Sequence, residues 1–217
     1  MAIAETVIEP VVAEVPVRTL DELVAVVGEP IPIVRDKVQT RLHDLHRQWL
    51  EASPFCILAT SDADGRLDAS PKGDPAGLLV HVLDETTIAL AERPGNRRVD
   101  GYRNVLANPH VGLIFFVPGR DDTLRVNGRA RLVSDAPWFD AVAVKGRRPI
   151  LALVVDVEEV FTHCSKAFLR SKLWHPETWE PDAVPSRAVF SHTFERADQP
   201  LAEVEAHYGP AYAENLY

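Results

Sequence analysis

The sequence is short of cysteine and has no long apolar run. Only two of its 217 residues are cysteines, Cys56 and Cys164. They offer no disulfide framework, and no repeated C-x-x-C pattern is present for zinc. No segment approaches the length of a membrane-spanning helix, and the segment 1–17 lacks the basic start and continuous apolar core of a signal peptide. These absences predict a cytoplasmic protein that has no membrane partner.

Basic residues are also scarce. The chain holds 23 lysines and arginines against 32 aspartates and glutamates, for a net charge of -9. A nucleic-acid-binding protein normally presents a broad basic face, so we expect no nucleic-acid partner. Any site for an anion must instead be a local cluster of cations. The 46% hydrophobic and 25% charged composition is typical of globular proteins and predicts one domain with extensions.

Several motifs that would identify a common chemistry are missing. No G-x-G-x-x-G, G-x-x-x-x-G-K-[ST] or G-x-S-x-G pattern occurs, so the sequence lacks the motifs typical of dinucleotide, P-loop and hydrolase sites. His43 and His46 have no glutamate arranged as in H-E-x-x-H, and His163 with Cys164 is a single pair without further ligands at suitable spacing. We therefore assign no metal ligand.

The chain is predicted to consist of a main domain with two extensions. Residues 1–33 form an N-terminal arm and a short helix, because prolines interrupt the first part and Thr19 with Glu22 makes a capping-box pattern. The main domain covers residues 34–175. A C-terminal extension, residues 176–217, completes the chain.

The main domain is predicted to open with a long helix and to continue as short strands. Apolar residues recur at helical spacing from Val34 to Trp49. From residue 55 onward, apolar or alternating runs are separated by turn residues, with helices at 97–106 and near 136–144. Closely spaced strands with few helices favour a closed antiparallel barrel over a doubly wound sheet. The predicted strands are 55–60, 67–71, 77–83, 86–91, 110–117, 123–133 and 149–161.

Two adjacent arginines stand where a helix is predicted to begin. Arg97 and Arg98 follow a Pro-Gly-Asn turn, although the first turn of a helix favours acids. One interpretation is that Asn96 caps the helix and that free backbone amides and both guanidiniums hold a phosphate. The alternative is that Glu92 and Asp100 neutralise the arginines at the surface. Both interpretations stay open at this point.

A second polar cluster favours the phosphate site. The segment ASPKGDPAG leaves a predicted strand with Ser70 and Lys72 close together and then turns through two glycines. A hydroxyl, an ammonium and exposed backbone amides are thereby offered at one edge of the barrel. A solvated turn has a similar composition, so the segment supports a phosphate site only in combination with the arginine pair.

The order of these segments resembles a known family. A hairpin, SPKGD, a second hairpin, a GNRR helix, NPHVGLIFFV and TLRVNGRA follow one another as in the pyridoxamine 5'-phosphate oxidase-like family of FMN-binding split-barrel proteins. The resemblance covers roughly residues 40–175. It implies a mainly β (α+β) fold, a six- to seven-stranded antiparallel split β-barrel with peripheral helices. It also implies a homodimer that binds FMN at the subunit interface.

The resemblance implies roles for particular residues. Those that open the helix hold the FMN phosphate, those that leave the second strand approach the ribityl chain and ring, and main chain after the fourth strand lines the isoalloxazine. A residue of the long strand reaches the partner's flavin, and the segment HCSKAFLRSKLW closes the site from the second subunit. The resemblance assigns the FMN phosphate to Asn96, Arg97 and Arg98, and the ribityl chain and ring to Ser70, Lys72 and Asp74. It assigns the isoalloxazine to Ala91 and Glu92, with Arg93 beside them. It assigns the partner's flavin to Thr123, and closure of the site from the second subunit to Lys166, Arg170, Ser171 and Trp174.

The chain departs from the family at its end. Pyridoxamine phosphate oxidases carry an R-L-x-P motif that grips the substrate phosphate, whereas this chain ends AHYGPAYAENLY. We therefore expect an FMN-binding oxidoreductase that acts on an unidentified small molecule, with a nicotinamide or similar donor, and not a vitamin B6 oxidase. Because the flavin carries the hydride chemistry, no catalytic side chain is assigned.

Two alternatives from other functional classes remain. One is a protein that binds a flavin or haem for sensing, without turnover. The other is a reductase that depends on the deazaflavin F420, whose acidic tail requires a basic groove. Such a groove would have to gather arginines near the predicted helix start with Lys72. The arginines in question are Arg93, Arg97, Arg98 and Arg103.

Overall fold

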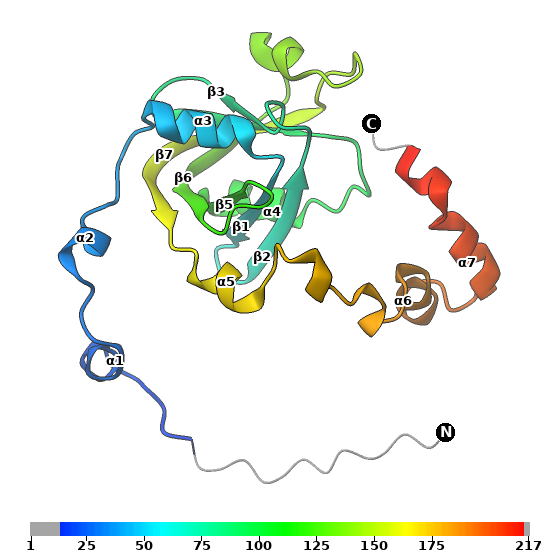
Figure 1. Cartoon of the computed structure of the whole chain (residues 1–217). Coiled ribbons are helices and arrows are strands. Elements are labelled where there is room, and N and C mark those ends of the chain that lie inside the picture. Colours follow the sequence, from blue (N-terminus) through cyan, green and yellow to red (C-terminus); the bar gives the residue numbers. More distant parts are fainter. Residues whose placement is uncertain (1–13, 215–217) are drawn as a thin grey trace. The chain divides into compact units, whose positions relative to one another are not determined.

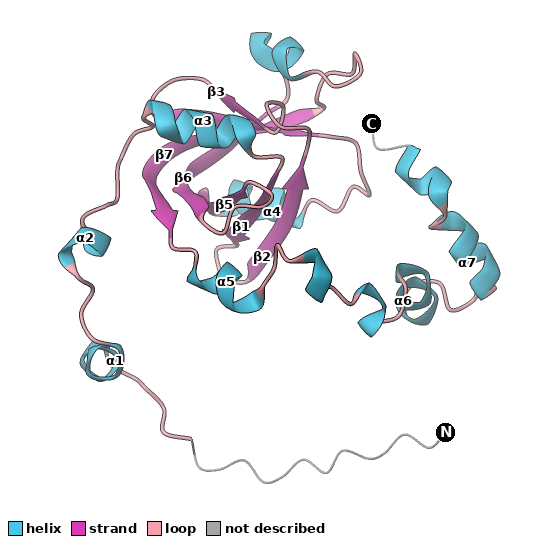
Figure 2. Ribbon diagram, in the orientation of Figure 1, coloured by secondary structure: helices cyan, strands magenta, loops and turns pink. Residues whose placement is uncertain are grey.

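Seven antiparallel strands form one curled sheet in the computed structural model (Figures 1 and 2). Their order is β2-β1-β5-β6-β7-β4-β3. This arrangement confirms the α+β split barrel. The sheet is not closed as the strand pattern predicted, because β2 and β3 are its two edges and are not paired with each other in the described part of the chain. The strands are β1 Phe55–Ser61, β2 Leu67–Gly73, β3 Val80–Val82, β4 Thr87–Glu92, β5 His110–Phe116, β6 Thr123–Val133 and β7 Leu151–His163.

The structure describes residues 14–214, and the chain divides into two units between Lys37 and Val38. The predicted arm lies largely outside the described residues. In the first unit, helix α1 (Leu20–Val27) begins at the predicted capping box: the amide of Glu22 donates to the Thr19 hydroxyl at 3.2 Å. This short helix is confirmed. A single further turn, α2 (Pro32–Arg35), follows it.

The long helix predicted from Val34 to Trp49 is wrong. Helix α2 ends at Arg35, and α3 (Asp44–Ala52) begins only in the second unit. Between them the backbone of Gln39 pairs with Val160 of β7, with N–O distances of 3.0 and 2.8 Å. Because those hydrogen bonds replace helical ones, the apolar spacing does not produce a continuous helix.

The remaining helices are short. Helix α4 (Asp100–Ala107) packs on β1, β2 and β6, and a 3-10 helix occupies Pro137–Val142 where a helix near 136–144 was predicted. Within the described residues no helix has both the length and the apolar character to span a membrane. The C-terminal part contains α5 (Lys166–Ser171), α6 (Arg187–Phe194), α7 (Leu201–His207) and 3-10 turns at Pro176–Thr178, Pro181–Ala183 and Pro210–Glu214.

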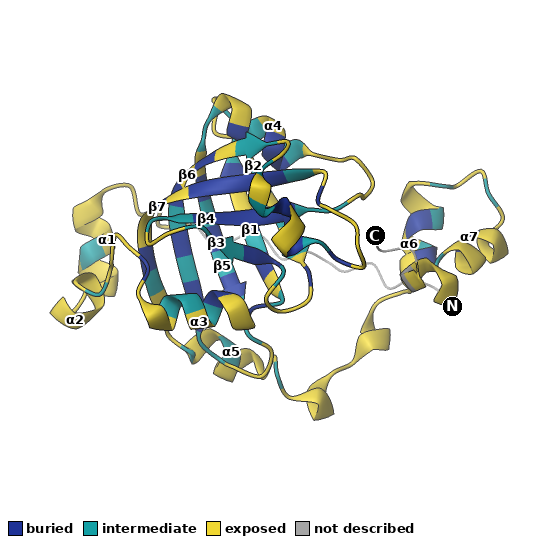
Figure 3. Cartoon of the chain, turned by 90° about the horizontal axis from the view of Figure 1, so that it is seen from above, coloured by how far each residue is buried: buried dark blue, intermediate teal, exposed yellow. Residues whose placement is uncertain are grey.

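The core lies on the inner face of the sheet (Figure 3). Strands β1 and β5 alternate between buried and partly exposed residues, as half-buried strands do. Leu58, Leu113 and Leu124 are at most 1% exposed. A β-bulge between Asn127 and Gly128 shifts the register of β6 against β7 and adds to the local twist.

Candidate functional site

The two arginines precede helix α4 instead of opening it. The helix begins at Asp100, with Val99 at the N-cap, so the predicted start at residue 97 is wrong. Arg97 adopts a left-handed φ of 64°, which a helix does not tolerate. The Asn96 side chain accepts the amide hydrogen of Arg98 at 2.9 Å and therefore stabilises a turn and does not cap the helix.

Strand β2 carries a row of polar side chains on the face that α4 covers. Asp68, Ser70 and Lys72 are half-buried, whereas the residues between them are exposed. The row is paired across the sheet with the buried residues of β1. Gly101 permits the close approach of α4, since a Cβ there would lie 2.9 Å from a carboxylate oxygen of Asp68. The start of α4 is thus held against the polar row.

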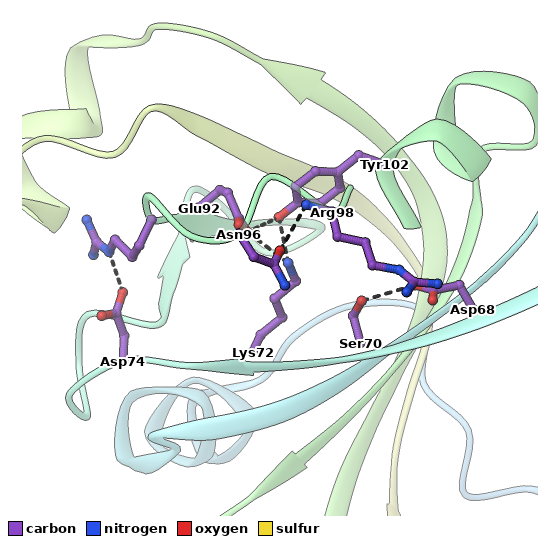
Figure 4. A network of polar contacts seen from close by, with 9 residues as sticks. Asp68, Ser70, Lys72, Asp74, Glu92, Asn96, Arg98 and Tyr102 are labelled. Atoms are coloured by element: carbon purple, nitrogen blue, oxygen red, sulfur yellow. Dashed lines mark hydrogen bonds and ion pairs between the residues drawn. The ribbon is translucent and has the colours of Figure 1, made fainter. Parts of the chain in front are cut away.

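Lys72, Glu92 and Tyr102 form a hydrogen-bonded triad (Figure 4). The Lys72 Nζ lies 2.8 Å from Glu92 Oε2 and 3.1 Å from the Tyr102 hydroxyl, which in turn donates to Glu92 Oε2. Burial, followed by the charge and hydrogen bond of Glu92, raises the pKa of Tyr102. The phenol therefore keeps its proton, and the triad fixes the Lys72 side chain at the wall of a cavity.

That cavity has a volume of about 290 Å³ and brings five of the predicted residues together. The structure thus unites strand β2, the second strand of the first hairpin, with the turn before α4 (Figure 4). Arg97 is not among the residues that line it. The predicted residues are Ser70, Lys72, Glu92, Asn96 and Arg98, and the other lining residues are Asp68, Pro71 and Asp100.

Arg98 is engaged with Asp100, at 2.6 Å between Nε and Oδ2, as the surface-neutralisation alternative proposed. The Arg98 side chain is 80% exposed, and an exposed pair of this kind contributes only about 0–1 kcal/mol. A charge-assisted hydrogen bond to phosphate is worth about 1.5–3 kcal/mol. The ion pair therefore does not prevent Arg98 from binding a phosphate in this cavity.

Asp74 and Arg93 form a separate, buried ion pair. Arg93 Nε lies 2.6 Å from Asp74 Oδ2, with the two side chains 11% and 1% exposed, and Arg93 also donates to the carbonyl of Val142 at 2.8 Å. Neither residue lines the cavity, and Ala91 is buried in β4 opposite Ala152 of β7. The pair ties the loop after β2 to the end of β4 and to the 3-10 helix.

The other predicted residues lie around a second cavity, of about 420 Å³, between α5 and strands β5 to β7. Thr123, Lys166 and Arg170 line it. Ser171 and Trp174 do not: the Ser171 hydroxyl donates to the carbonyl of Phe168 at 3.1 Å, and the Trp174 indole donates to that of Arg120 at 2.7 Å. These two bonds hold α5 and the segment after it in place.

The sequence interpretation missed residues in both cavities. Asp68 lines the first and Tyr102 supports it, while Arg125 and His163 line the second. The alternating pattern of β2 would have revealed Asp68, because residues two and four positions apart on a strand share a face. No local pattern marks Tyr102 as a partner of Lys72, which is distant in the sequence.

A family model described as pyridoxamine 5'-phosphate oxidase matches residues 42–164, more than half of the chain. The chain belongs to the pyridoxamine 5'-phosphate oxidase family. The match covers all seven strands and α4, so both halves of the first cavity lie within the family domain. Among proteins of curated function, no sequence match reaches significance.

Solved structures of similar proteins cover about the same part of the chain. HupZ from Group A Streptococcus is 19% identical, with 56% of this chain and 93% of that chain covered and a TM-score of 0.44. An F420 reductase is 17% identical, with 56% of this chain and 98% of that chain covered and a TM-score of 0.41. A protein from Clostridium acetobutylicum related to general stress protein 26 is 15% identical. The alignment covers 54% of this chain and 89% of that chain, with a TM-score of 0.39.

Proposed function

We propose that this chain is an FMN-binding oxidoreductase that holds the cofactor phosphate between β2 and the turn before α4. The observation that carries the proposal is the shared cavity of Ser70, Lys72, Asn96 and Arg98 in a member of a family that generally binds flavin. Ligand sites usually occupy about 300–1,000 Å³. The cavity is at the lower limit and is suited to the phosphate end of the cofactor.

The charges in the cavity are compatible with a phosphate once their partners are considered. Glu92 is already used by Lys72 and Tyr102, and Asp68 accepts the Ser70 hydroxyl at 3.0 Å. Asp100 is held by the weak exposed pair with Arg98. The first backbone amides of α4 have no intrahelical acceptor and add hydrogen-bond donors. Lys72, Arg98 and these amides then bind and orient the phosphate.

The proposed cofactor site needs a second subunit. Phe55 is 39% exposed on the outer face of β1, and Ile57, Ile114 and Phe116 beside it are only partly buried. Members of the family are commonly dimers. We assign this apolar face to a homodimer interface, across which Thr123 and the α5 segment of one subunit reach the flavin of the other.

The bound flavin supplies hydride or electron transfer between a donor and a small-molecule substrate. The protein's own contribution is to hold the phosphate, exclude water and hold the Lys72 side chain at a fixed position. Asp74 and Arg93 act through the loop they brace, and Ala91 lies in the strand that ends at Glu92. No side chain is required to exchange a proton with the substrate.

An F420-dependent reductase is the second candidate, because a neighbouring cavity of about 290 Å³ is lined by Arg66, Arg98 and Arg103. This cavity provides part of the basic groove that an acidic tail needs. Asp68 and Asp100 also line it, however, and Arg93 is committed elsewhere. Because Asp68 and Asp100 line both cavities, the commitment of Arg93 to Asp74 is what leaves the groove incomplete and favours a single phosphate over an extended polyanion.

Anaerobic mixing of FMN-loaded protein with NADH or NADPH tests the proposed activity. We expect the flavin band to bleach with one of these donors, and pyridoxamine 5'-phosphate to leave it unchanged, because the R-L-x-P clamp for that substrate's phosphate is missing and its reactive bond is not oriented. Bleaching by pyridoxamine 5'-phosphate would restore a vitamin B6 oxidase. Bound FMN that neither nicotinamide reduces would indicate a binding protein, and tighter binding of F420 than of FMN would indicate the second candidate.

A further inference from the structure

A larger cavity, of about 560 Å³, lies beside α3, where β5 and β7 end and β6 begins. Its volume is within the range of about 300–1,000 Å³ that ligand sites occupy, and barrel mouths are among the usual places for such sites. One face of α3 forms a wall, because residues four and seven positions apart on a helix lie on the same side. The apolar lining residues are Leu45, Trp49, Ala52, Val117 and Leu124.

This cavity is separate from the proposed flavin site and from the homodimer face. Leu124 and Thr162 are paired across β6 and β7 and both line it, whereas the adjacent pair of Thr123 and His163 lines the cavity beside α5. Because successive residues of a strand point to opposite faces, the two cavities lie on opposite faces of the sheet. No residue of the proposed phosphate site or of the proposed dimer interface lines the cavity beside α3.

The indole N–H of Trp49 is the unusual feature of this cavity. Trp49 Nε1 is buried and has no hydrogen-bond partner within residues 14–214. Buried polar groups are almost always hydrogen-bonded, and leaving one unpaired is costly. The indoles of Trp174 and Trp179, by contrast, each donate to a backbone carbonyl. The described chain therefore leaves a donor at this cavity without an acceptor.

The charges of the cavity balance one another. Among the described residues that line it, only Arg120 and Asp122 are ionised, and they form a two-fold pair with N–O distances of 3.0 and 2.8 Å. Burial, followed by the charge of His43, lowers the pKa of His46, so this lining residue is neutral at pH 7. The His43 amide donates to His46 Nδ1 at 3.2 Å, which leaves the ring proton on Nε2. The cavity thus offers neutral N–H donors and no unbalanced charge.

Arg120 is the part of the wall that can move. Its guanidinium lies over the Trp49 ring, 4.6 Å from the centroid, and its side chain is 55% exposed. An exposed ion pair such as the one with Asp122 contributes little stability. The backbone of Arg120 stays in place, because its carbonyl accepts the Trp174 indole at 2.7 Å. A ligand can therefore displace the guanidinium and reach the Trp49 N–H without disturbing the turn.

We infer that this cavity binds an uncharged carbonyl compound that carries an apolar ring. The ring packs between α3 and the strand residues Val117 and Leu124, and the carbonyl oxygen accepts the hydrogen of the Trp49 indole. A charged ligand is disfavoured, because its charge would stay unbalanced against a mostly apolar wall. The binding requires neither flavin nor a second subunit, so the inference does not depend on the proposed function.

Calorimetric titration of the full chain tests this inference with matched probes. Acetophenone and ethylbenzene are nearly equal in size and shape, but only acetophenone has a carbonyl. Acetophenone is expected to bind about fivefold or more tightly, because it satisfies a buried donor that ethylbenzene leaves unpaired. Benzoate is expected to bind more weakly than acetophenone, because no unbalanced cation lines the cavity. Equal binding of acetophenone and ethylbenzene, or tightest binding of benzoate, would overturn the inference.

Substitutions locate the effect. Trp49→Phe keeps an aromatic ring without the N–H and is expected to abolish the preference for acetophenone over ethylbenzene. Trp138→Phe makes the same change in the 3-10 helix, outside this cavity, and should keep the preference. Ala52→Phe adds a ring at an exposed lining position of α3 and should weaken the binding of both probes. A preference that survives Trp49→Phe, or undiminished binding to the Ala52 variant, would place the probes elsewhere and contradict the inference.

Titration of the same samples with FMN separates this site from the proposed function. Trp49→Phe should leave the FMN affinity unchanged, because its cavity lies on the opposite face of the sheet from Thr123. A loss of FMN affinity that Trp138→Phe does not share would make the cavity part of the flavin site and overturn its assignment as a separate one. Protein that prefers acetophenone but does not bind FMN keeps the carbonyl site and loses the flavin proposal.

Discussion

Replacing Arg98 by alanine is expected to weaken FMN binding about tenfold and to leave riboflavin binding unchanged. The variant loses a charge-assisted contact worth about 1.5–3 kcal/mol, and the exposed pair with Asp100 that Arg98 gives up on binding offsets at most about 1 kcal/mol of this. A net loss of about 1.4 kcal/mol corresponds to tenfold in affinity. Riboflavin has no phosphate, so its affinity does not depend on Arg98. Fluorescence titration of both flavins measures the difference.

Two further variants serve as controls for that experiment. Arg97→Ala should have a smaller effect than Arg98→Ala, because Arg98 lines the cavity and Arg97 does not. Arg47→Ala removes the same charge from α3, outside the cavity, and should change neither affinity. Equal losses for FMN and riboflavin in the Arg98 variant would place the phosphate site elsewhere.

Gly128→Ala is expected to destabilise the barrel by about 3 kcal/mol, at the upper end of what overpacking costs. A Cβ at this position would lie 2.1 Å from the carbonyl oxygen of Asp156 and 3.1 Å from a methyl carbon of Val155. Both atoms belong to β7, so the added methyl group must push β6 and β7 apart at the bulge. For a chain of this size the expected fall in Tm is about 6–12 °C.

Gly95→Ala is the matched control for the stability measurement. No atom lies within 4 Å of a Cβ built at Gly95, and its φ is not positive. The same chemical change should therefore alter Tm by no more than about 2 °C. A Gly128→Ala variant that melts together with Gly95→Ala would show that the bulge does not hold β6 and β7 in the described contact.

Much of the sheet could be predicted from local patterns, whereas features fixed by distant contacts could not. The alternation over 123–133 predicted the bounds of β6 correctly, because half-buried strands repeat every two residues. The apolar spacing from Val34 to Trp49 is equally regular but predicted one continuous helix, whereas α2 ends at Arg35 and α3 begins at Asp44. Its failure depends on Gln39 pairing with Val160, and the bulge at Gly128 likewise depends on its neighbouring strand.

The candidate site was predictable at the level of segments. Ser70 and Lys72 were expected to meet the residues before α4, and the cavity unites them with Asn96 and Arg98. The roles of individual residues within these segments were harder to predict from the sequence. Asn96 stabilises a turn and does not cap the helix, since the left-handed conformation of Arg97 delays the start of α4. Composition does not reveal such a turn.

The central claim is that two copies of this chain together hold FMN. Sedimentation velocity of the FMN-reconstituted protein, recorded at both the protein and the flavin absorption bands, tests it most directly. The account predicts that the flavin sediments with a species of twice the chain mass, at one FMN per chain, and that Ile57→Glu on the outer face of β1 converts this species to a monomer that releases the flavin. Flavin that remains free, or that sediments with a stable monomer, would contradict the account.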